Sequence, residues 1–247
     1  MMPEVQRFAV SAWSAWAPKR ETPADWHMWA GAADKIARDA DAGSVVLPMM
    51  LRRRITALGQ KMIAGALACG ETARTGRYVL ASRHGEFSRT LRILESLAAH
   101  ELPSPAEFSM SVHNGLAGLL SIHSGNMRGH TALAAGIDTF GFGLMEAAAC
   151  LAEQPREPVL FFFGDESLSG EFDIFGGDDV DLPLVVALAL QTPGAGDDGI
   201  LFDAVPRNSN ERPTTAASID FLRFLLSGAE TAVSEGVRMT WTWRRAA

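Results

Sequence analysis

Runs and alternations of apolar residues predict the strands of this chain. Two continuous apolar runs, at residues 159–163 and 184–190, are typical of strands that are covered on both faces. Strict alternation over residues 237–244 predicts a strand with one buried face, which carries Trp241 and Trp243. Shorter apolar stretches predict further strands at residues 8–16, 78–81 and 131–137.

Apolar residues spaced three and four apart predict helices between these strands, at residues 51–66, 87–98, 112–122, 140–151 and 217–226. Ser109 or Ser111 is expected to cap the third of these helices. The segment around Trp26 and Trp29 is predicted to be a loop, and so is the stretch 192–213, which contains several glycines and aspartates. Strands that alternate with helices predict an α/β fold, in which a layered sheet carries helices on both faces.

Composition and charge limit the possible classes of protein. The chain has 247 residues, of which 47% are hydrophobic, so it fits one large or two small domains with a sizeable core. Its net charge of −7 argues against nucleic acid or an anionic membrane as the main partner. No apolar run reaches the roughly 18–20 residues of a membrane span, and no secretory signal is recognisable at the N-terminus. We therefore expect a cytoplasmic protein.

Motifs with a defined chemistry are few. Cys69 and Cys150 both lie in alanine-rich helical runs and are expected to be buried and unreactive. His113 and His123 are separated by a spacing that does not match a helical metal pair. The acidic run at residues 173–181 lacks the spacing of a calcium loop and is predicted to be a solvated loop. The sequence predicts no metal site and no cofactor.

Three short motifs follow one another over about half of the chain. P-M-M-L-R-R-R-I-T-A-L-G-Q starts at Pro48, S-R-H-G-E occupies residues 82–86, and N-G-L-A-G-L-L-S-I-H-S-G ends at Gly125. In this order they resemble the N-terminal half of β-ketoacyl synthases, the first of two similar halves in the thiolase fold. The resemblance implies a single thiolase-like half domain over residues 1–247, in which residues 214–247 form a capping helix and strand.

The resemblance also implies where a catalytic cysteine would lie, because in this family it starts a helix that follows a buried strand. The run V-L-F-F-F-G at residues 159–164 resembles the strand that comes after this helix. Counting back by the family's spacing places Asp138 at the cysteine position and Gly141 at the glycine of the elbow. The alternative, in T-A-L-A-A-G, places Leu133 at the cysteine position. Neither candidate is a cysteine.

Without this cysteine the family's condensation reaction lacks its nucleophile. Condensation needs a thiolate that accepts the acyl group as a thioester. A carboxylate at Asp138 stabilises the positive end of a helix but makes no useful acyl carrier. The family's second half supplies two catalytic histidines, and no histidine follows His130 here. G-H-T-A-L-A-A-G around His130 resembles a motif of that second half, but we interpret His130 as a polar residue at the start of a buried strand. We expect no activity from the chain alone.

Among relatives of this family, the chain resembles the chain length factors of type II polyketide systems that make aryl polyenes. This resemblance implies a non-catalytic subunit that forms a heterodimer with a catalytic ketosynthase and meets acyl carrier protein through the complex. Seven residues are candidates for the interface or for a wall of the acyl tunnel: Phe108, Met110, His113, Leu116, Gly118, Leu119 and Leu120. Two alternatives are a small acyl-transfer or hydrolytic enzyme that uses Asp138 or His130, and a homodimeric scaffold without activity.

Overall fold

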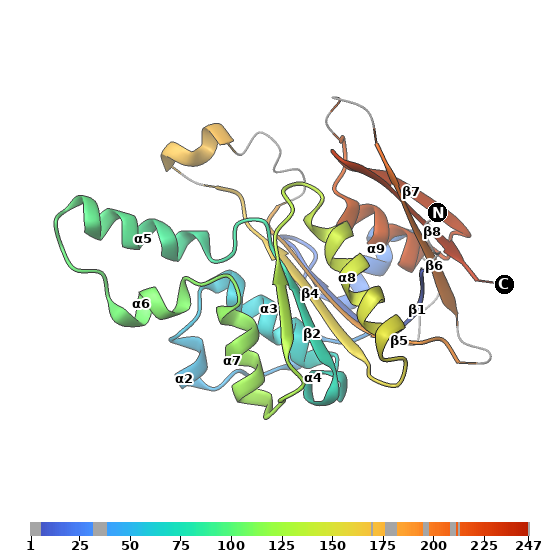
Figure 1. The fold of residues 1–247 in the computed structure, drawn as a ribbon, viewed down its shortest axis with the longest axis horizontal. Coiled ribbons are helices and arrows are strands. Elements are labelled where there is room, and N and C mark those ends of the chain that lie inside the picture. Colours follow the sequence, from blue (N-terminus) through green and yellow to red (C-terminus); the bar gives the residue numbers. More distant parts are fainter. Residues whose placement is uncertain are drawn as a thin grey trace.

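One eight-stranded sheet organises the part of the chain that the structure describes. The computed structural model describes residues 6–31, 39–168, 170–175, 182–194, 198–207, 211 and 213–246. The strands are β1 (Gln6–Trp16), β2 (Arg77–Ala81), β3 (His130–Leu133), β4 (Val159–Asp165), β5 (Leu184–Gln191), β6 (Gly199–Pro206), β7 (Thr231–Glu235) and β8 (Met239–Arg245). They lie in the order β3-β2-β4-β5-β1-β6-β8-β7 (Figure 1).

The sheet has a parallel end and an antiparallel end. β2 lies between β3 and β4 and runs parallel to both, with Val79 opposite Thr131 and Phe161. β5 runs antiparallel to β4 and to β1, and β6, β8 and β7 continue the sheet as antiparallel neighbours. The carboxyl ends of β2, β3 and β4 therefore meet at one edge, which is where functional sites of open α/β sheets commonly lie.

Helices cover both faces of the sheet, which confirms the predicted fold class. They are α1 (Pro23–Ala30), α2 (Met49–Arg52), α3 (Ala57–Ala68), α4 (Thr72–Thr75), α5 (Phe87–Ala98), α6 (Pro105–Met110), α7 (Gly115–Ser124), α8 (Thr139–Glu153) and α9 (Ala217–Ser227), with the short 3-10 helices η1 (Ala42–Ser44) and η2 (Gly170–Phe175). Phe161 and Phe163 of β4 face the core under α1, α8 and α9, whereas Leu160 and Phe162 face the core under α3 and α7 (Figure 1). This alternation explains why β4 reads as an unbroken apolar run.

The predicted loop around Trp26 is wrong, because these residues form α1. The Thr22 side chain accepts the N–H of Asp25, and the Asp25 carboxylate accepts the N–H of Thr22, which together make a capping box. Pro23 occupies the first helical position, where its missing N–H costs nothing. The fully buried Trp26 ring then fixes the helix to the sheet. The sequence T-P-A-D is the signal that predicts this helix start.

The predicted loop at residues 192–213 is also wrong, because it contains β6. This strand pairs with β1 and β8, and its residues Ile200 and Phe202 are buried. The glycines and aspartates around the strand conceal its apolar alternation. β7 was not predicted either, because as the outermost strand it is mostly exposed and lacks an apolar pattern. Part of the predicted loop and residues 176–181 of the acidic run lie outside the described residues.

Two helices differ from their predicted bounds. The predicted helix at 51–66 is divided into α2 and α3, and the Thr56 side chain caps the start of α3. The predicted helix at 112–122 begins only at α7. Ser109 and Ser111 do not cap it, because their hydroxyls donate to carbonyl groups of α6.

The C-terminal segment packs into the core under α8. Phe221 of α9 and Trp241 and Trp243 of β8 are fully buried. Phe202 stacks against both tryptophans, with ring centroids 5.9 Å and 6.2 Å apart. The helix and the strand predicted in this segment are both present, and β8 is a member of the main sheet.

Candidate functional site

Asp138 lies at the start of α8, immediately after the turn that follows β3. β3 ends at Leu133, earlier than predicted. The Asp138 side chain is only 1% exposed, and its carboxylate accepts the backbone N–H groups of Val237 (3.0 Å) and Arg238 (2.9 Å). The Arg238 guanidinium lies 3.4 Å from the same carboxylate and donates to the Ala135 carbonyl at 2.7 Å. The carboxylate therefore fixes the turn between β7 and β8 onto the start of α8.

Close packing holds this turn in the same place. A Cβ atom at Gly236 would overlap the Asp138 carboxylate, and a Cβ atom at Gly141 would overlap the indole of Trp241. Both glycines therefore allow an approach that a side chain would prevent. The chain's own β7–β8 hairpin covers the position where the resemblance implies a nucleophile.

The other residues considered for catalysis do not join Asp138. Leu133, the alternative cysteine position, is the last residue of β3 and is partly buried. His130 begins the same strand, and its Nε2 lies 3.1 Å from Nδ2 of Asn114. Asp138 and His130 therefore have separate hydrogen-bond partners.

The two cysteines lie away from the start of α8. Cys69 follows the last residue of α3 and Cys150 lies near the end of α8. Burial raises the pKa of the Cys69 thiol to about 12. Burial also raises the pKa of the Cys150 thiol, against the smaller effect of the Arg77 charge. Neither thiol has the lowered pKa of a cysteine nucleophile.

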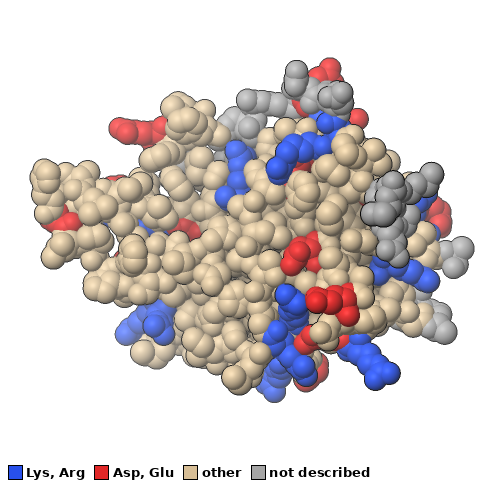
Figure 2. Space-filling model, viewed as in Figure 1, with Lys and Arg blue, Asp and Glu red and all other residues tan. Residues whose placement is uncertain are grey.

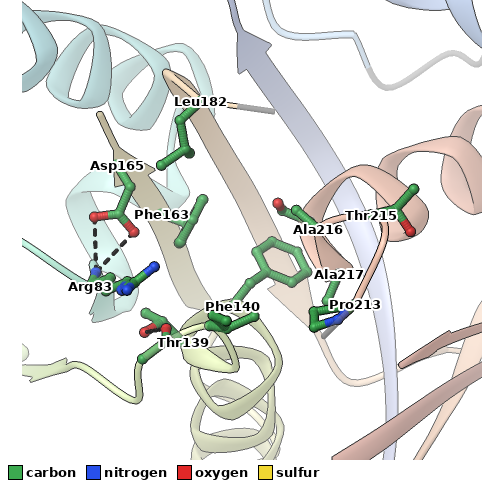
Figure 3. Close-up of a pocket in the computed structure, with 13 residues that line it drawn as sticks. Arg83, Thr139, Phe140, Phe163, Asp165, Leu182, Pro213, Thr215, Ala216 and Ala217 are labelled. Carbon is green, nitrogen blue, oxygen red and sulfur yellow. Dashed lines mark hydrogen bonds between the residues drawn. The ribbon is translucent and has the colours of Figure 1, made fainter. Parts of the chain in front are cut away.

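A small cavity lies beside the start of α8 (Figure 3). Thr139 and Phe140 of α8, Phe163 and Asp165 of β4 and Ala216 before α9 contribute to its walls. Its volume of about 50 Å³ is enough for a few water molecules. An acyl chain does not fit into this cavity.

Asp165 organises the loop that follows β2. Its buried carboxylate accepts hydrogen bonds from the Ser82 hydroxyl (2.9 Å), the Arg83 N–H (2.9 Å) and the His84 N–H (3.1 Å). Burial raises the pKa of Asp165 to about 6, although these hydrogen bonds favour the charged form. The motif S-R-H-G-E is thus folded around a carboxylate at the end of β4, which sequence analysis did not identify as its partner.

The seven predicted interface residues do not form one surface. Four of them are buried under the sheet: Met110, Leu116, Leu119 and Leu120. Phe108 is 64% exposed on α6, whereas His113 is partly buried with its Nε2 2.8 Å from the Ser82 carbonyl oxygen. Gly118 faces open space, since a Cβ atom there would meet nothing within 4 Å. The four buried residues belong to the core of this chain, and a role at an interface or in the wall of an acyl tunnel stays a prediction for all seven.

α5 and α6 form a projection at one end of the molecule (Figure 1). We call residues 87–110 the arm. α5 contacts α6, and α6 contacts α7. Large apolar side chains of the arm are exposed: Leu94 by 46%, Leu97 by 52% and Leu102 by 96%. Sequence analysis predicted the helix over residues 87–98 but not that it would leave the body of the fold.

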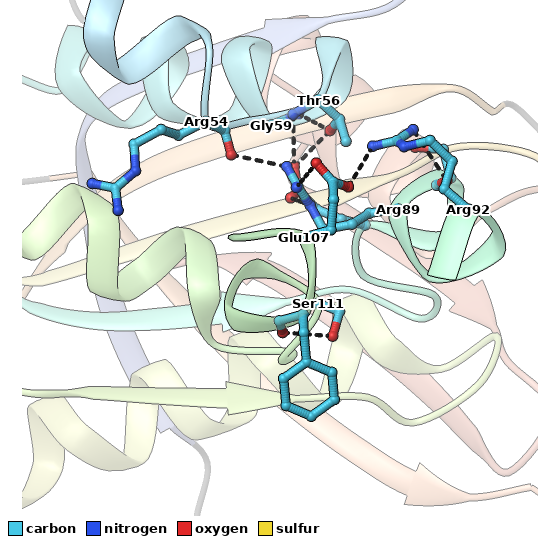
Figure 4. Close-up of polar contacts among 10 residues, drawn as sticks. Arg54, Thr56, Gly59, Arg89, Arg92, Glu107 and Ser111 are labelled. Carbon is cyan, nitrogen blue, oxygen red and sulfur yellow. Dashed lines mark hydrogen bonds and ion pairs between the residues drawn. The ribbon is translucent and has the colours of Figure 1, made fainter. Parts of the chain in front are cut away.

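A buried cluster of charged side chains lies at the base of the arm (Figure 4). Arg89 is buried, and its guanidinium contacts Glu86 (3.0 Å), Glu107 (2.8 Å) and the Arg54 carbonyl (2.8 Å). The Glu86 carboxylate also accepts the hydroxyl of Thr56 at 2.6 Å and its N–H at 3.1 Å. Removing one partner from such a buried pair typically costs about 3–5 kcal/mol. The E-x-x-R spacing in the sequence is the local signal that indicates part of this cluster.

The part of the chain that the structure describes contains neither a membrane-spanning helix nor a metal-binding cluster. None of its helices has the length and the apolar character needed to cross a membrane. Within the same ranges, no group of three or more His, Cys, Asp or Glu side chains is arranged to hold a metal ion.

Solved structures with the same fold include ketosynthases and their complexes. A complex from Xenorhabdus doucetiae, described as the ketosynthase ApeO with its chain length factor ApeC, contains a chain that matches with a TM-score of 0.81 and 29% identity, over 98% of this chain and 100% of that one. A type II polyketide ketosynthase in complex with its acyl carrier protein, AntDE:AntF, matches with a TM-score of 0.64 and 14% identity, over 83% and 70%. A β-ketoacyl synthase from Burkholderia phymatum matches with a TM-score of 0.55 and 13% identity, over 91% and 71%. The latter two indicate the fold alone.

A comparison of the sequence with family models identifies the family. A family model described as the β-ketoacyl synthase N-terminal domain matches residues 26–244, and no curated protein matches the chain. This match spans most of the chain and agrees with the thiolase-like fold of its structural neighbours. The chain belongs to the β-ketoacyl synthase N-terminal domain family.

Proposed function

We propose that this chain is a non-catalytic chain length factor that pairs with a catalytic β-ketoacyl synthase in polyketide or fatty-acid-like biosynthesis, of the aryl polyene type. The structure around the start of α8 is the observation that carries the proposal. Asp138 begins α8 where the resemblance implies the catalytic cysteine, and its carboxylate binds the turn that covers this position. A residue used in this way is a structural anchor.

The chemistry of the surrounding residues supports the absence of condensation activity. A carboxylate does not replace a thiolate as the acyl carrier. Burial raises the pKa of both thiols and keeps them protonated at neutral pH. The cavity beside α8 holds only a few water molecules. This cavity therefore offers no room for an acyl chain beside the start of α8.

The length of the matched chain supports the pairing. This chain and the matched chain of the ApeO–ApeC complex cover one another almost completely, whereas this chain covers about 70% of the two other ketosynthases. We infer that this chain has, in its own system, the role that the matched chain has in the ApeO–ApeC complex. Acyl carrier protein would then meet this subunit through the complex, in the cytoplasm.

We further propose that residues 1–247 act as a single thiolase-like half domain capped by residues 214–247. Phe221, Trp241 and Trp243 are all fully buried against the face that carries α8. Burial of one large apolar side chain contributes about 1.5–3 kcal/mol. Deletion of the residues after Ser234 should therefore cause aggregation or a large loss of thermal stability, measured by light scattering and calorimetry. Unchanged melting and solubility would contradict the capping role.

Co-expression with the catalytic ketosynthase of the same organism tests the pairing. Native mass spectrometry of the purified complex should show one copy of each chain. A homodimer of this chain, with free ketosynthase, would favour the scaffold alternative. In parallel, the isolated chain should release no carbon dioxide from malonyl-loaded carrier protein, and release by the isolated chain would favour the enzymatic alternative.

A further inference from the structure

An open depression lies between α1 and the turn that precedes this helix. Its volume is about 430 Å³, and the residues that line it are Pro18, Lys19, Arg20, Asp25, Met28 and Trp29. Sites for small molecules commonly have volumes of about 300–1,000 Å³ and combine apolar walls with a few polar groups. None of these residues lines the small cavity beside the start of α8. The depression is therefore a separate candidate binding site.

A tight turn places two cations at this depression. Ala17 and Arg20 exchange two backbone hydrogen bonds of 3.0 Å, with Pro18 and Lys19 between them. Proline in the second position is typical of a type II turn, whose third position requires a positive φ. Lys19 has a φ of 69°, a left-handed conformation that glycine adopts readily and a residue with a Cβ atom does not. A lysine where the backbone favours glycine indicates that its side chain has a function.

The guanidinium group of Arg20 lies over two tryptophan rings. Its central carbon is 4.8 Å from the ring centroid of Trp26 and 5.1 Å from that of Trp29. Cation–π contacts with both rings hold the planar group in place. Within the described part of the chain, its Nε has no hydrogen-bond partner and no carboxylate lies within ion-pair distance of the group. A guanidinium that is held but not paired keeps N–H donors for an anion.

A third cation reaches the same depression from α9. The guanidinium carbon of Arg223 is 4.8 Å from the ring centroid of Trp29, the ring that also contacts Arg20. The two like charges are therefore less than about 10 Å apart, a separation over which salt screens their repulsion only in part. The carboxylate of Asp25 also lines the depression, but its Oδ2 accepts the N–H (2.9 Å) and the hydroxyl (2.8 Å) of Thr22. One carboxylate against three cations leaves the site positive, so a bound anion would relieve the repulsion.

The charge of the whole molecule favours a small anion over a large one. The chain carries a net charge of −7, which repels a polyanion. On the face that Figure 2 shows, Lys and Arg side chains lie in small groups, several of them beside Asp or Glu. This pattern differs from the broad basic surface of a nucleic-acid-binding protein. Among small anions, a phosphate group suits this site because both ammonium and guanidinium groups bind it through charge-assisted hydrogen bonds.

We propose that this depression binds a small phosphate monoester that has an apolar or aromatic body. Lys19 and Arg20 bind the phosphate group, and Arg223 adds positive charge beside it. Trp29 and Met28 contact the body of the ligand. Met28 is 78% exposed, so the ligand covers apolar surface that is otherwise in water. This site is independent of the proposed pairing with a ketosynthase and would stand if that pairing were not observed.

Titration of the full chain with inorganic phosphate and with phenyl phosphate tests the site. Both compounds should shift the indole N–H resonance of Trp29 in NMR spectra, and added sodium chloride should weaken both because the site is open to solvent. Phenyl phosphate should bind more tightly than inorganic phosphate, since its ring covers apolar side chains. Equal affinities would overturn the monoester as the ligand class. No shift of Trp29 with either compound would overturn the site itself.

Lys19→Gly separates ligand binding from folding. Glycine suits the left-handed position, so the melting temperature should be unchanged or higher, whereas the affinity for phenyl phosphate should fall about ten-fold. Arg223→Gln removes an exposed charge beside Trp29 and should lower the affinity by a smaller factor. Arg156→Gln is its matched control, because Arg156 is an exposed arginine in the turn between α8 and β4, and it should change the affinity less than about two-fold. Wild-type affinity in Lys19→Gly, or an equal loss in Arg156→Gln, would overturn the site.

Discussion

Replacing Asp138 with alanine is expected to destabilise the chain strongly, since its carboxylate is the acceptor that holds the β7–β8 turn. The substitution leaves the N–H groups of Val237 and Arg238 without their acceptor at a partly buried position, since both residues are themselves exposed and only Asp138 is buried. An unsatisfied buried group costs about 1–3 kcal/mol. Two such groups give a loss of roughly 2–6 kcal/mol, and partial entry of water places our expectation at about 3–4 kcal/mol. Asp138→Cys should lose a similar amount and gain no condensation activity.

Urea denaturation followed by tryptophan fluorescence measures this loss directly. Trp241 and Trp243 lie on β8, the strand that follows the turn, so their emission should report the release of the hairpin. Glu95→Ala is the control, because Glu95 is an exposed carboxylate on α5 with no hydrogen bond or ion pair among the described residues. It should change the free energy of unfolding by less than about 0.5 kcal/mol. A loss below about 1 kcal/mol for Asp138→Ala would refute the argument that this carboxylate anchors the hairpin.

Three further predictions concern packing, pH and the thiols. Gly141→Val should lower the free energy of unfolding by about 1–3 kcal/mol, because its side chain overlaps Trp241; urea midpoints equal to the wild type would contradict this packing. The pKa of Asp165 is raised from 3.8 to about 6 in the folded state, so the folded chain binds this proton more tightly and stability should fall as the pH rises from about 4 to about 6. Asp165→Asn should flatten this part of the pH profile of unfolding, and an unchanged slope would show that other groups cause it. Cys69 and Cys150 should react with iodoacetamide only after unfolding, since burial raises the pKa of both; rapid labelling of the native chain, seen by mass spectrometry, would contradict their burial.

Elements with both faces buried were the ones that the sequence predicts best. β4 and β5 appear as unbroken apolar runs because alternate residues enter two different cores. The amphipathic helices α5, α8 and α9 follow from their three- and four-residue spacing. The prediction of a loop was wrong for α1, because the start of this helix depends on the capping box at Thr22 and its apolar residues have no clear helical spacing. The sequence does not predict β7, because an outer strand needs no apolar pattern.

The contacts of the candidate site lay beyond the reach of sequence reasoning. Asp138 and Val237 are 99 positions apart, and no local pattern indicates that a carboxylate will hold a turn so distant in the chain. The same is true of Asp165, which binds the Ser82 loop across 83 positions. The sequence correctly predicts that α7 is apolar. Spacing alone, however, does not distinguish an apolar helix face that enters the core from one that meets a partner.

Condensation by a reconstituted pair tests the central claim most directly. The ketosynthase of the same organism, this chain and acyl carrier protein are supplied with malonyl and starter groups, and product lengths are measured by mass spectrometry. The account predicts that products form only when this chain is present and the ketosynthase keeps its own cysteine. Product formation that persists after the ketosynthase's cysteine is replaced by alanine would contradict the claim that this chain is a non-catalytic subunit.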